Sequence, residues 1–239
     1  MTEPLYRDDA YLAECTASVT AINDRGGVIL DRSVFYPTGG GQPGDPGVLV
    51  WDGGETPVAT TVRGEAPGEI VHVPAEGAAL PPVGAPVTAR LDWPTRWRHM
   101  RLHTALHLLS VVIPLPVTGG SIGADKGRLD FDMPEPPEDR EALEARINAL
   151  AAADHPVSVE WISDAELAAK PELVKTMAVK PPMGQGRVRL IRIGTPEATV
   201  DLQPCGGTHV RSTAEIGRIR LGKIEKKGRQ NRRVAITLD

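Results

Sequence analysis

The hydrophobic and polar residues of the chain follow two patterns, which change near residue 90. In the first part, short apolar segments are separated by turns rich in Gly, Pro, Asn and Asp, and no segment keeps the spacing of a helix. The clearest strands are expected at 17–22, 28–30 and 48–51. This pattern predicts a small β-barrel-like module over residues 1–89, which the proline-rich stretch 74–86 is expected to connect to the next module.

The second part opens with a predicted helix that starts near Asp92-Trp-Pro94. Pro94 lies in the first turn, where its missing N–H is harmless, and prolines at 114 and 116 end the helix. Its apolar stripe consists of Leu102, Leu106, Leu109 and Ile113. The recurrence of these residues every three or four positions is typical of a helix.

The rest of the second module is expected to mix helices and strands. An amphipathic helix is predicted at 137–153, and a capping box from Ser163 to Glu166 begins a short helix. Residues 117–122 are expected to form a loop. The fold class is therefore α+β, a small N-terminal β-barrel-like module followed by an α+β domain over residues 90–239. The strands expected in this domain are 128–132, 156–162, 186–193, 199–202, 216–224 and 232–238.

The composition is typical of a globular protein. With 239 residues, 41% of them hydrophobic, the chain can bury a sizeable core. It has no apolar run long enough to cross a membrane and no basic-then-apolar leader, so a cytoplasmic protein is expected. Two cysteines make no disulfide framework, which fits a reducing compartment. Cys15 is expected to be a buried small residue in a strand.

The charge is distributed unevenly. The formal net charge is −4, but residues 1–89 carry 4 Lys or Arg against 12 Asp or Glu, which leaves 23 against 19 for residues 90–239. Eight basic residues and only two acidic ones lie between positions 217 and 239. Because a local basic patch attracts a phosphate backbone whatever the total charge, a nucleic-acid partner remains compatible with the chain.

Histidines on the first helix and a later cysteine motif together predict a metal site. His99, His103 and His107 recur every four residues and therefore share a helix face. In Cys205-Gly-Gly-Thr-His209, the glycines let the backbone turn so that thiol and imidazole converge. Cysteine and histidine are the ligands that zinc prefers, so one zinc ion per chain is expected, bound by His103, His107, Cys205 and His209. The role of His99 stays open between a ligand in place of His103, a residue near the substrate and a solvated side chain.

A glycine-rich stretch is the most unusual part of the first module. It covers residues 35–45 and reads Phe-Tyr-Pro-Thr-Gly-Gly-Gly-Gln-Pro-Gly-Asp. Three consecutive glycines are expected where a loop approaches another surface or exposes its amides, although an ordinary turn of the barrel explains them as well. The stretch is not a P-loop, because no Gly-Lys-Ser/Thr ending follows.

These motifs together resemble a known family. His103-Thr-Ala-Leu-His107 and Cys205-Gly-Gly-Thr-His209 resemble the paired zinc signatures of the alanyl-tRNA synthetase editing domain and of its freestanding relatives, the AlaX-type alanyl-tRNA editing proteins. The glycine-rich stretch is similar to that of the medium-length members. The chain lacks an aminoacylation domain, so the resemblance implies editing in trans without charging of tRNA. Two further segments that carry the resemblance are 128–131 and 226–233.

The resemblance implies hydrolysis of the ester between a wrong amino acid, chiefly serine and secondly glycine, and alanine tRNA. The residues agree with this chemistry, since a zinc ion that polarises the carbonyl or lowers the pKa of water to about 7 suffices for an activated ester. Thr104, Ala105 and Leu106 stand between the two histidines where a zinc peptidase has its catalytic glutamate. This absence argues against amide hydrolysis.

The number of expected ligands leaves two functions open. Four protein ligands are typical of a structural zinc site, whereas catalytic sites usually keep an open position. His209 is the ligand expected to be most open to exchange. The rival function is a non-catalytic, zinc-stabilised RNA-binding module.

Further roles follow from the resemblance. Thr118 is expected to hydrogen-bond the serine hydroxyl and so to recognise serine. A site that hydrogen-bonds this group rejects alanine, which lacks it. Thr104 is the weaker candidate for this role. Gln42 and the amides of Gly39, Gly40 and Gly41 are expected to serve the substrate. The expected contacts to the backbone of mischarged alanine tRNA are Arg96, Arg98, Arg101, Lys226, Lys227 and Arg229.

Overall fold

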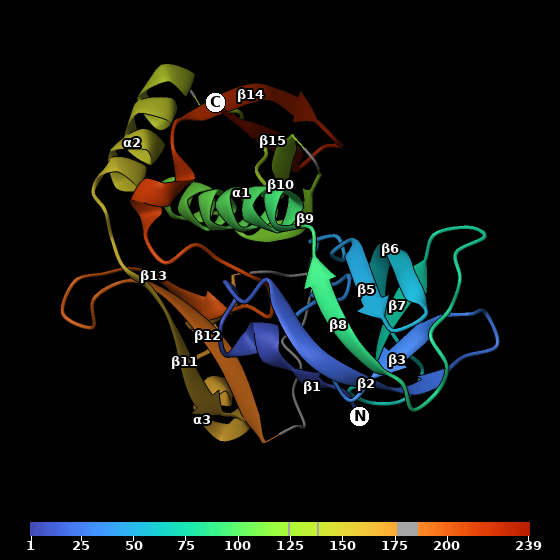
Figure 1. The fold of residues 1–239 in the computed structure, drawn as a ribbon. Coiled ribbons are helices and arrows are strands. Elements are labelled where there is room, and N and C mark those ends of the chain that lie inside the picture. The colour runs from blue at the N-terminus through green and yellow to red at the C-terminus, as the bar shows by residue number, and fades with distance from the viewer. Residues whose placement is uncertain (124, 138, 176–185) are drawn as a thin grey trace. The chain divides into compact units, whose positions relative to one another are not determined.

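The computed structural model describes residues 1–123, 125–137, 139–175 and 186–239. The chain divides into two compact units, Met1–Arg98 and His99–Asp239, and it mixes helices with strands (Figure 1). None of the helices in the described ranges is long and apolar enough to cross a membrane.

A closed six-stranded barrel forms the main part of the first unit. The strand order is β2-β3-β7-β6-β5-β8, and β8 pairs with β2 to close the barrel. The strands expected at 17–22, 28–30 and 48–51 are confirmed. Two short strands pair beside the barrel, β1 (Glu3–Pro4) and β4 (Arg32–Ser33). The barrel strands are β2 (Glu14–Ile22), β3 (Val28–Leu30), β5 (Gly47–Trp51), β6 (Gly54–Arg63), β7 (Ile70–Pro74) and β8 (Pro86–Leu91).

The interior of the barrel is apolar because alternate side chains of its strands point inward. Leu30, Leu49 and Ala89 are fully buried there. The proline-rich stretch 74–86 leads from β7 to β8 inside this unit, so the expectation that it connects two modules is wrong. Its prolines suit it to the surface of the barrel, where no ladder hydrogen bonds are required.

Helix α1 (Trp93–Val112) runs across the boundary between the two units, with Pro94 in its first turn as expected. In the second unit it packs on a four-stranded antiparallel sheet of order β14-β15-β10-β9 (Figure 1). A Cβ atom at Gly127 would lie 3.2 Å from the Leu106 side chain, so this glycine lets the helix approach the sheet closely. The strands are β9 (Val117–Ile122), β10 (Lys126–Asp132), β14 (Ile219–Lys226) and β15 (Asn231–Leu238).

Residues 117–122 form strand β9, so the loop expected there is wrong. Gly119 and Gly120 have poor strand propensity, but the strand is held by its pairing with β10. Opposite Asp130 and Phe131 the pairing shifts by one residue, so Thr118 is the extra residue of a β-bulge.

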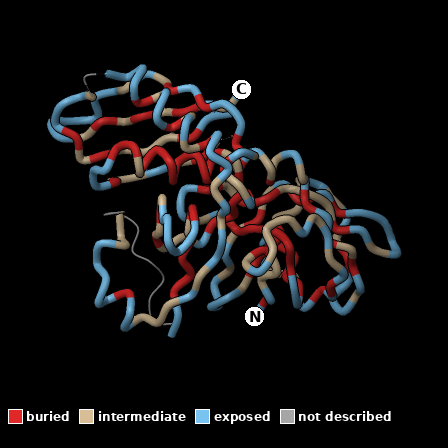
Figure 2. Tube along the Cα trace, turned by 90° about the vertical axis from the view of Figure 1, so that its left-hand side faces the viewer, coloured by how far each residue is buried: buried red, intermediate tan, exposed pale blue. Residues whose placement is uncertain are grey.

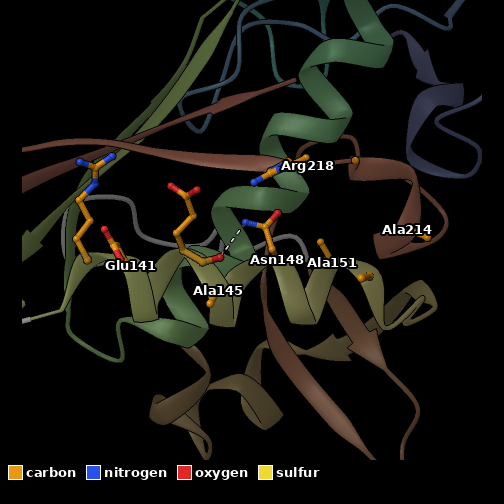
Figure 3. Close-up of a pocket in the computed structure, with 10 residues that line it drawn as sticks. Glu141, Ala145, Asn148, Ala151, Ala214 and Arg218 are labelled. Carbon is orange, nitrogen blue, oxygen red and sulfur yellow. Dashed lines mark hydrogen bonds between the residues drawn. The ribbon is translucent and has the colours of Figure 1, made fainter.

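Helix α2 (Arg140–Ala152) covers part of the free edge of β14. The Asn148 side chain donates to the Ile219 carbonyl and accepts from the Ile219 amide. Glu144 accepts from the Leu221 amide, and Arg140 donates to the Leu221 carbonyl. A cavity of about 740 Å³ lies beside these residues and is lined by Glu141, Asn148 and Arg218, among others (Figure 3). The helix expected at 137–153 is confirmed, with Asp139 as its N-cap.

A second antiparallel sheet of three strands completes the second unit, in the order β11-β12-β13. Short helix α3 (Asp164–Ala168) follows β11 and begins with the expected capping box. Buried, intermediate and exposed residues follow one another along the trace (Figure 2), and in β15 every second residue from Arg232 to Ile236 is buried. The strands of this sheet are β11 (Val157–Ser163), β12 (Arg187–Gly194) and β13 (Thr199–Pro204). In the part of the chain that the structure describes, the single-turn 3₁₀ helices are Leu5–Arg7, Pro171–Leu173 and Thr213–Ile216.

Candidate metal centre

Four side chains of the second unit converge in one cluster. His103 and His107 come from successive turns of α1, and Cys205 and His209 from the loop after β13. One ligand atom of each lies within 4.8 Å of those of the others. The three histidines are buried and the cysteine is partly buried. The four residues expected from the sequence to share a site are therefore brought together.

The separations fit a tetrahedral metal ion. Zinc bonds of about 2.0–2.3 Å place neighbouring ligand atoms about 3.3–3.6 Å apart. The Cys205 Sγ atom lies 3.4 Å from His103 Nε2 and 3.3 Å from His209 Nε2. The donor set of one thiolate and three imidazoles is one that zinc prefers. These residues could hold a zinc ion.

The loop that carries the cysteine is held by a buried arginine. Arg189 on β12 donates to the carbonyls of Cys205 and Gly207, both at 2.9 Å. Its own carbonyl accepts from the Cys205 amide at 3.1 Å. The glycines make this turn sterically accessible, and the hydrogen bonds of Arg189 hold it in place. The positions of Cys205 and His209 therefore depend on a tertiary contact as well as on the local sequence.

Two of the imidazoles are oriented by hydrogen bonds on their far side. His107 Nδ1 donates to Asp201 Oδ2 at 2.9 Å. Thr104 Oγ1 gives its only proton to the Met100 carbonyl at 2.9 Å, so it accepts from His209 Nδ1 at 3.1 Å. Both rings therefore turn Nε2 toward the cluster, the arrangement in which a metal-binding histidine is held. Thr104 contacts a ligand in this way.

Asp201 is the centre of a buried network behind His107. Besides the imidazole, its carboxylate accepts from Lys175 Nζ at 2.5 Å and from Gln203 Nε2 at 2.7 Å. Burial raises the pKa of Asp201, but the hydrogen bond from His107 and the charges of His107 and Lys175 outweigh it and lower the pKa to about 2. The group is therefore a carboxylate at neutral pH.

The protonation states differ among the members of the cluster. Burial raises the pKa of Cys205, but the neighbouring His103 and His209 lower it well below its ordinary value, which favours the thiolate. Burial and the charge of His103 lower the pKa of His209 to about 3. For His107, burial acts downward, yet hydrogen bonds to Asp201 and Cys205 raise the pKa to about 9. Cys205 and His209 thus favour the thiolate and the neutral imidazole, the forms that bind metal ions, whereas His107 must release a proton when a metal ion binds.

Lys175 connects this network to the strand that carries Thr118. Its carbonyl accepts from the Val117 amide at 3.0 Å, on the side of β9 away from β10. Thr118 Oγ1 donates to the Asp130 carbonyl at 3.1 Å and accepts from Asn231 Nδ2 at 2.7 Å. Thr118 can therefore offer a further ligand only a lone pair, which suits a hydroxyl donor.

The glycine-rich stretch of the first unit forms a tight turn. Gly39 and Gln42 exchange backbone hydrogen bonds of 3.0 and 3.1 Å, and Gly40 and Gly41 between them both have positive φ. Two consecutive positive φ angles are those of a type I′ turn and explain both glycines. The Gly40 and Gly41 backbone is exposed, while Gln42 is buried.

A buried ion pair anchors the base of this turn. The Arg96 guanidinium donates to the Asp45 carboxylate and to the Val34 carbonyl, and both charged side chains are fully buried. Asp45 also accepts from the Tyr36 amide at 2.6 Å. Arg96 therefore cannot make the RNA contact expected from the sequence. A single arginine in a helical pattern does not reveal whether its partner is a phosphate or a buried carboxylate.

The remaining basic residues proposed for RNA differ in their surroundings. Arg98 and Arg229 are exposed. Arg101 donates to the carbonyls of Ile216 and Asp239, and Lys227 pairs with Glu225. Lys226 is exposed.

His99 is buried and lies outside the cluster, so the solvated alternative for this residue is wrong. Asp201, Gln203 and Lys175 were not recognised from the sequence. Strand periodicity offers a signal for two of them, since Asp201 and Gln203 share one face of β13, and Cys205 follows at the next alternate position, directly after the strand. Lys175 has no such signal.

The chain is similar to proteins of known name along its whole length. Residues 188–235 match the threonyl and alanyl tRNA synthetase second additional domain, and residues 10–95 match class II (A) tRNA synthetases. The alanyl-tRNA editing protein AlaX-M of Methanosarcina acetivorans is 39% identical over 247 residues, covering 100% of this chain and 99% of that protein. The AlaX-M of Saccharolobus solfataricus is 34% identical with the same coverage. The AlaX-L of Pyrococcus horikoshii is 35% identical over 99% of this chain and 58% of its own length.

Proposed function

Because the chain belongs to the family of alanyl-tRNA editing proteins, we propose that it is a hydrolase that deacylates mischarged alanine tRNA in trans, chiefly the serine ester and secondly the glycine ester. The observation that carries this proposal is the cluster of His103, His107, Cys205 and His209 in a chain that spans 97–99% of three such relatives. Such an activity serves the fidelity of translation.

One zinc ion per chain is proposed to bind at these four residues. When bound, zinc would polarise the ester carbonyl or lower the pKa of a water molecule. The protein supplies the thiolate of Cys205 and imidazoles that Asp201 and Thr104 hold in orientation. His209 is the proposed exchangeable ligand, because its hydroxyl partner is neutral whereas His107 is held by a carboxylate.

Residues 90–239 are proposed to form the zinc-dependent editing domain, and residues 1–89 the module that presents the glycine-rich loop. Thr118 is the proposed reader of the serine hydroxyl, since its position at a bulge and its free lone pair suit that role. Substrate-binding roles are also proposed for Gln42 and for the backbone amides of Gly39, Gly40 and Gly41.

Mischarged alanine tRNA is the proposed partner. Contacts to its backbone are assigned to the exposed Arg98, Lys226 and Arg229, with Lys227 and Arg101 beside them. These cations would position the RNA without reading its sequence.

The rival is a non-catalytic, zinc-stabilised RNA-binding module, and the observation that favours it is the number of ligands. Four protein donors can close the coordination sphere of zinc. Both functions require the metal, so metal binding does not distinguish them. Hydrolysis of the aminoacyl ester distinguishes them, because only the enzyme cleaves it.

The test is deacylation of seryl, glycyl and alanyl esters of alanine tRNA by the purified protein, before and after removal of zinc. The expected result is zinc-dependent loss of the serine ester, slower loss of the glycine ester and retention of the alanine ester. A Cys205→Ser protein serves as the control for background hydrolysis. If no ester is cleaved while zinc and tRNA still bind, the non-catalytic function replaces the enzymatic one.

A further inference from the structure

Lys175 makes two contacts that serve different parts of the second unit. Its ammonium lies 2.5 Å from Asp201 Oδ1, and the other oxygen of that carboxylate accepts from His107 Nδ1. Its backbone carbonyl accepts from the Val117 amide, the residue before Thr118. One residue thus contacts both the carboxylate behind a candidate metal ligand and the strand of the candidate hydroxyl reader.

The contact with Asp201 is buried on the carboxylate side. The Asp201 side chain is fully buried, whereas that of Lys175 is 30% exposed. A buried carboxylate needs a positive partner because the interior solvates its charge poorly. The Gln203 amide contributes a further hydrogen bond but no charge. Lys175 is therefore the cation that pairs with the buried Asp201 carboxylate on the side away from His107.

The contact with Val117 holds an edge of a sheet. β9 is the last strand in the order β14-β15-β10-β9, so among the described residues no strand pairs with its outer side. The Lys175 carbonyl occupies this side at Val117, directly before the bulge at Thr118. An edge next to a bulge is where a strand bends most easily, so this hydrogen bond limits the movement of Thr118.

We propose that Lys175 is a positioning residue that fixes Asp201 behind His107 and, through the same residue's backbone, fixes strand β9 at Thr118. The side chain and the backbone carbonyl of Lys175 then fix the distance between the metal centre and Thr118. The inference concerns positioning and does not place Lys175 in contact with substrate. The part of the inference that concerns selectivity between serine and glycine esters rests on the proposed editing function.

The test compares Lys175→Met, which keeps the length of the side chain without its charge, with the parent protein. Zinc affinity is expected to fall about tenfold, since loss of a partner behind a metal ligand typically has effects of 10–100-fold. Amide hydrogen exchange of a peptide covering residues 113–120 is expected to accelerate, because the anchored backbone at Val117 loosens. Both measurements are independent of catalysis.

Two variants control the experiment. Lys170→Met removes an exposed lysine of the same segment and should leave both quantities within about twofold of the parent. Lys175→Arg keeps the charge and should restore most of the zinc affinity. A loss confined to Lys175→Met and repaired by arginine supports the inference. Unchanged zinc affinity or unchanged exchange at 113–120 in Lys175→Met overturns it.

The third measurement is the selectivity for serine ester over glycine ester. Lys175→Met is expected to lower kcat/KM for the serine ester more than for the glycine ester, because only serine has a hydroxyl for Thr118 to read. An equal loss for both esters removes the link to Thr118. If the parent protein cleaves no ester, the editing function fails, while zinc affinity and hydrogen exchange still decide whether Lys175 positions the two elements.

Discussion

The barrel and the metal centre each contain a buried histidine, and the pKa values of the two histidines are shifted in opposite directions. His72 in β7 contacts the Val28 carbonyl through Nδ1 at 3.0 Å and Ser33 Oγ through Nε2 at 2.8 Å. Burial lowers its pKa to about 4. His107 is also buried, but its Nδ1 partner is the carboxylate of Asp201, and its pKa is raised to about 9.

The difference shows that burial alone does not define a functional histidine. A carbonyl and a hydroxyl satisfy both nitrogens of His72 and leave it a neutral structural residue. A carboxylate and a thiolate around His107 supply negative charge, which a metal ion can share after displacing a proton. The partner's charge therefore distinguishes the two sites.

The largest effect is expected when the ligand itself is removed. His107→Ala should weaken zinc binding by about a hundredfold to a thousandfold, because one of four donors is lost from a site whose total binding energy is about 10–16 kcal/mol. Competition with a chromophoric chelator measures the affinity. His72→Gln is the matched control and should bind zinc as the parent does. Comparable loss in both variants would mean that the distinction between the two histidines is wrong.

The second largest effect is expected in the pH dependence of the free energy of unfolding. The folded-state pKa of His72 is about 4 against an ordinary value of 6.5, so the unfolded chain binds a proton that the folded barrel excludes. The free energy of unfolding should therefore be unaffected by His72 above pH 6.5 and fall by about 3 kcal/mol as the pH drops from 6.5 to 4. Urea unfolding, followed by the fluorescence of Trp51, Trp93 and Trp97 in the first unit, measures this change.

His72→Gln cannot titrate and provides the reference for that experiment. Its lower stability at neutral pH is subtracted, and only the slope between pH 6.5 and 4 is compared. The parent should lose more stability over this interval than the variant. Equal slopes would show that His72 is protonated in the folded barrel.

The smallest of the three effects concerns the carboxylate. Asp201→Asn keeps the shape of the side chain but removes the charge, and zinc affinity should fall about 10–100-fold. Isothermal titration with zinc measures the affinity. Glu160→Gln removes an ion-paired carboxylate from β11 of the same three-stranded sheet and serves as the control. An Asp201→Asn protein with parental affinity would contradict the role assigned to the charge.

The sequence was most informative where the relevant signal is local. The turns of α1 placed His103 and His107 together because four residues make about one helical turn, and the cysteine motif carried its own spacing. The capping box at Ser163 was equally clear. These features depend on interactions within a few residues.

Features that depend on distant partners were missed. The Lys175–Asp201 contact joins residues 26 apart, and the Asp201–His107 contact joins residues 94 apart. Arg96 has the sequence pattern of a surface cation, but it is buried in an ion pair with Asp45, which lies 51 residues away in the sequence. Residues 117–122 form a strand in place of the expected loop because pairing with β10 outweighs the weak strand propensity of Gly119 and Gly120.

The side chains of α2 that lie along β14 also bear on assembly. An open strand edge is a template on which a strand of another molecule can add. Asn148 and Glu144 occupy the amides of Ile219 and Leu221, so the first half of β14 offers no free ladder to a second copy of the chain. This part of the edge is therefore closed to strand exchange and to fibre growth, by a helix that does not belong to the sheet.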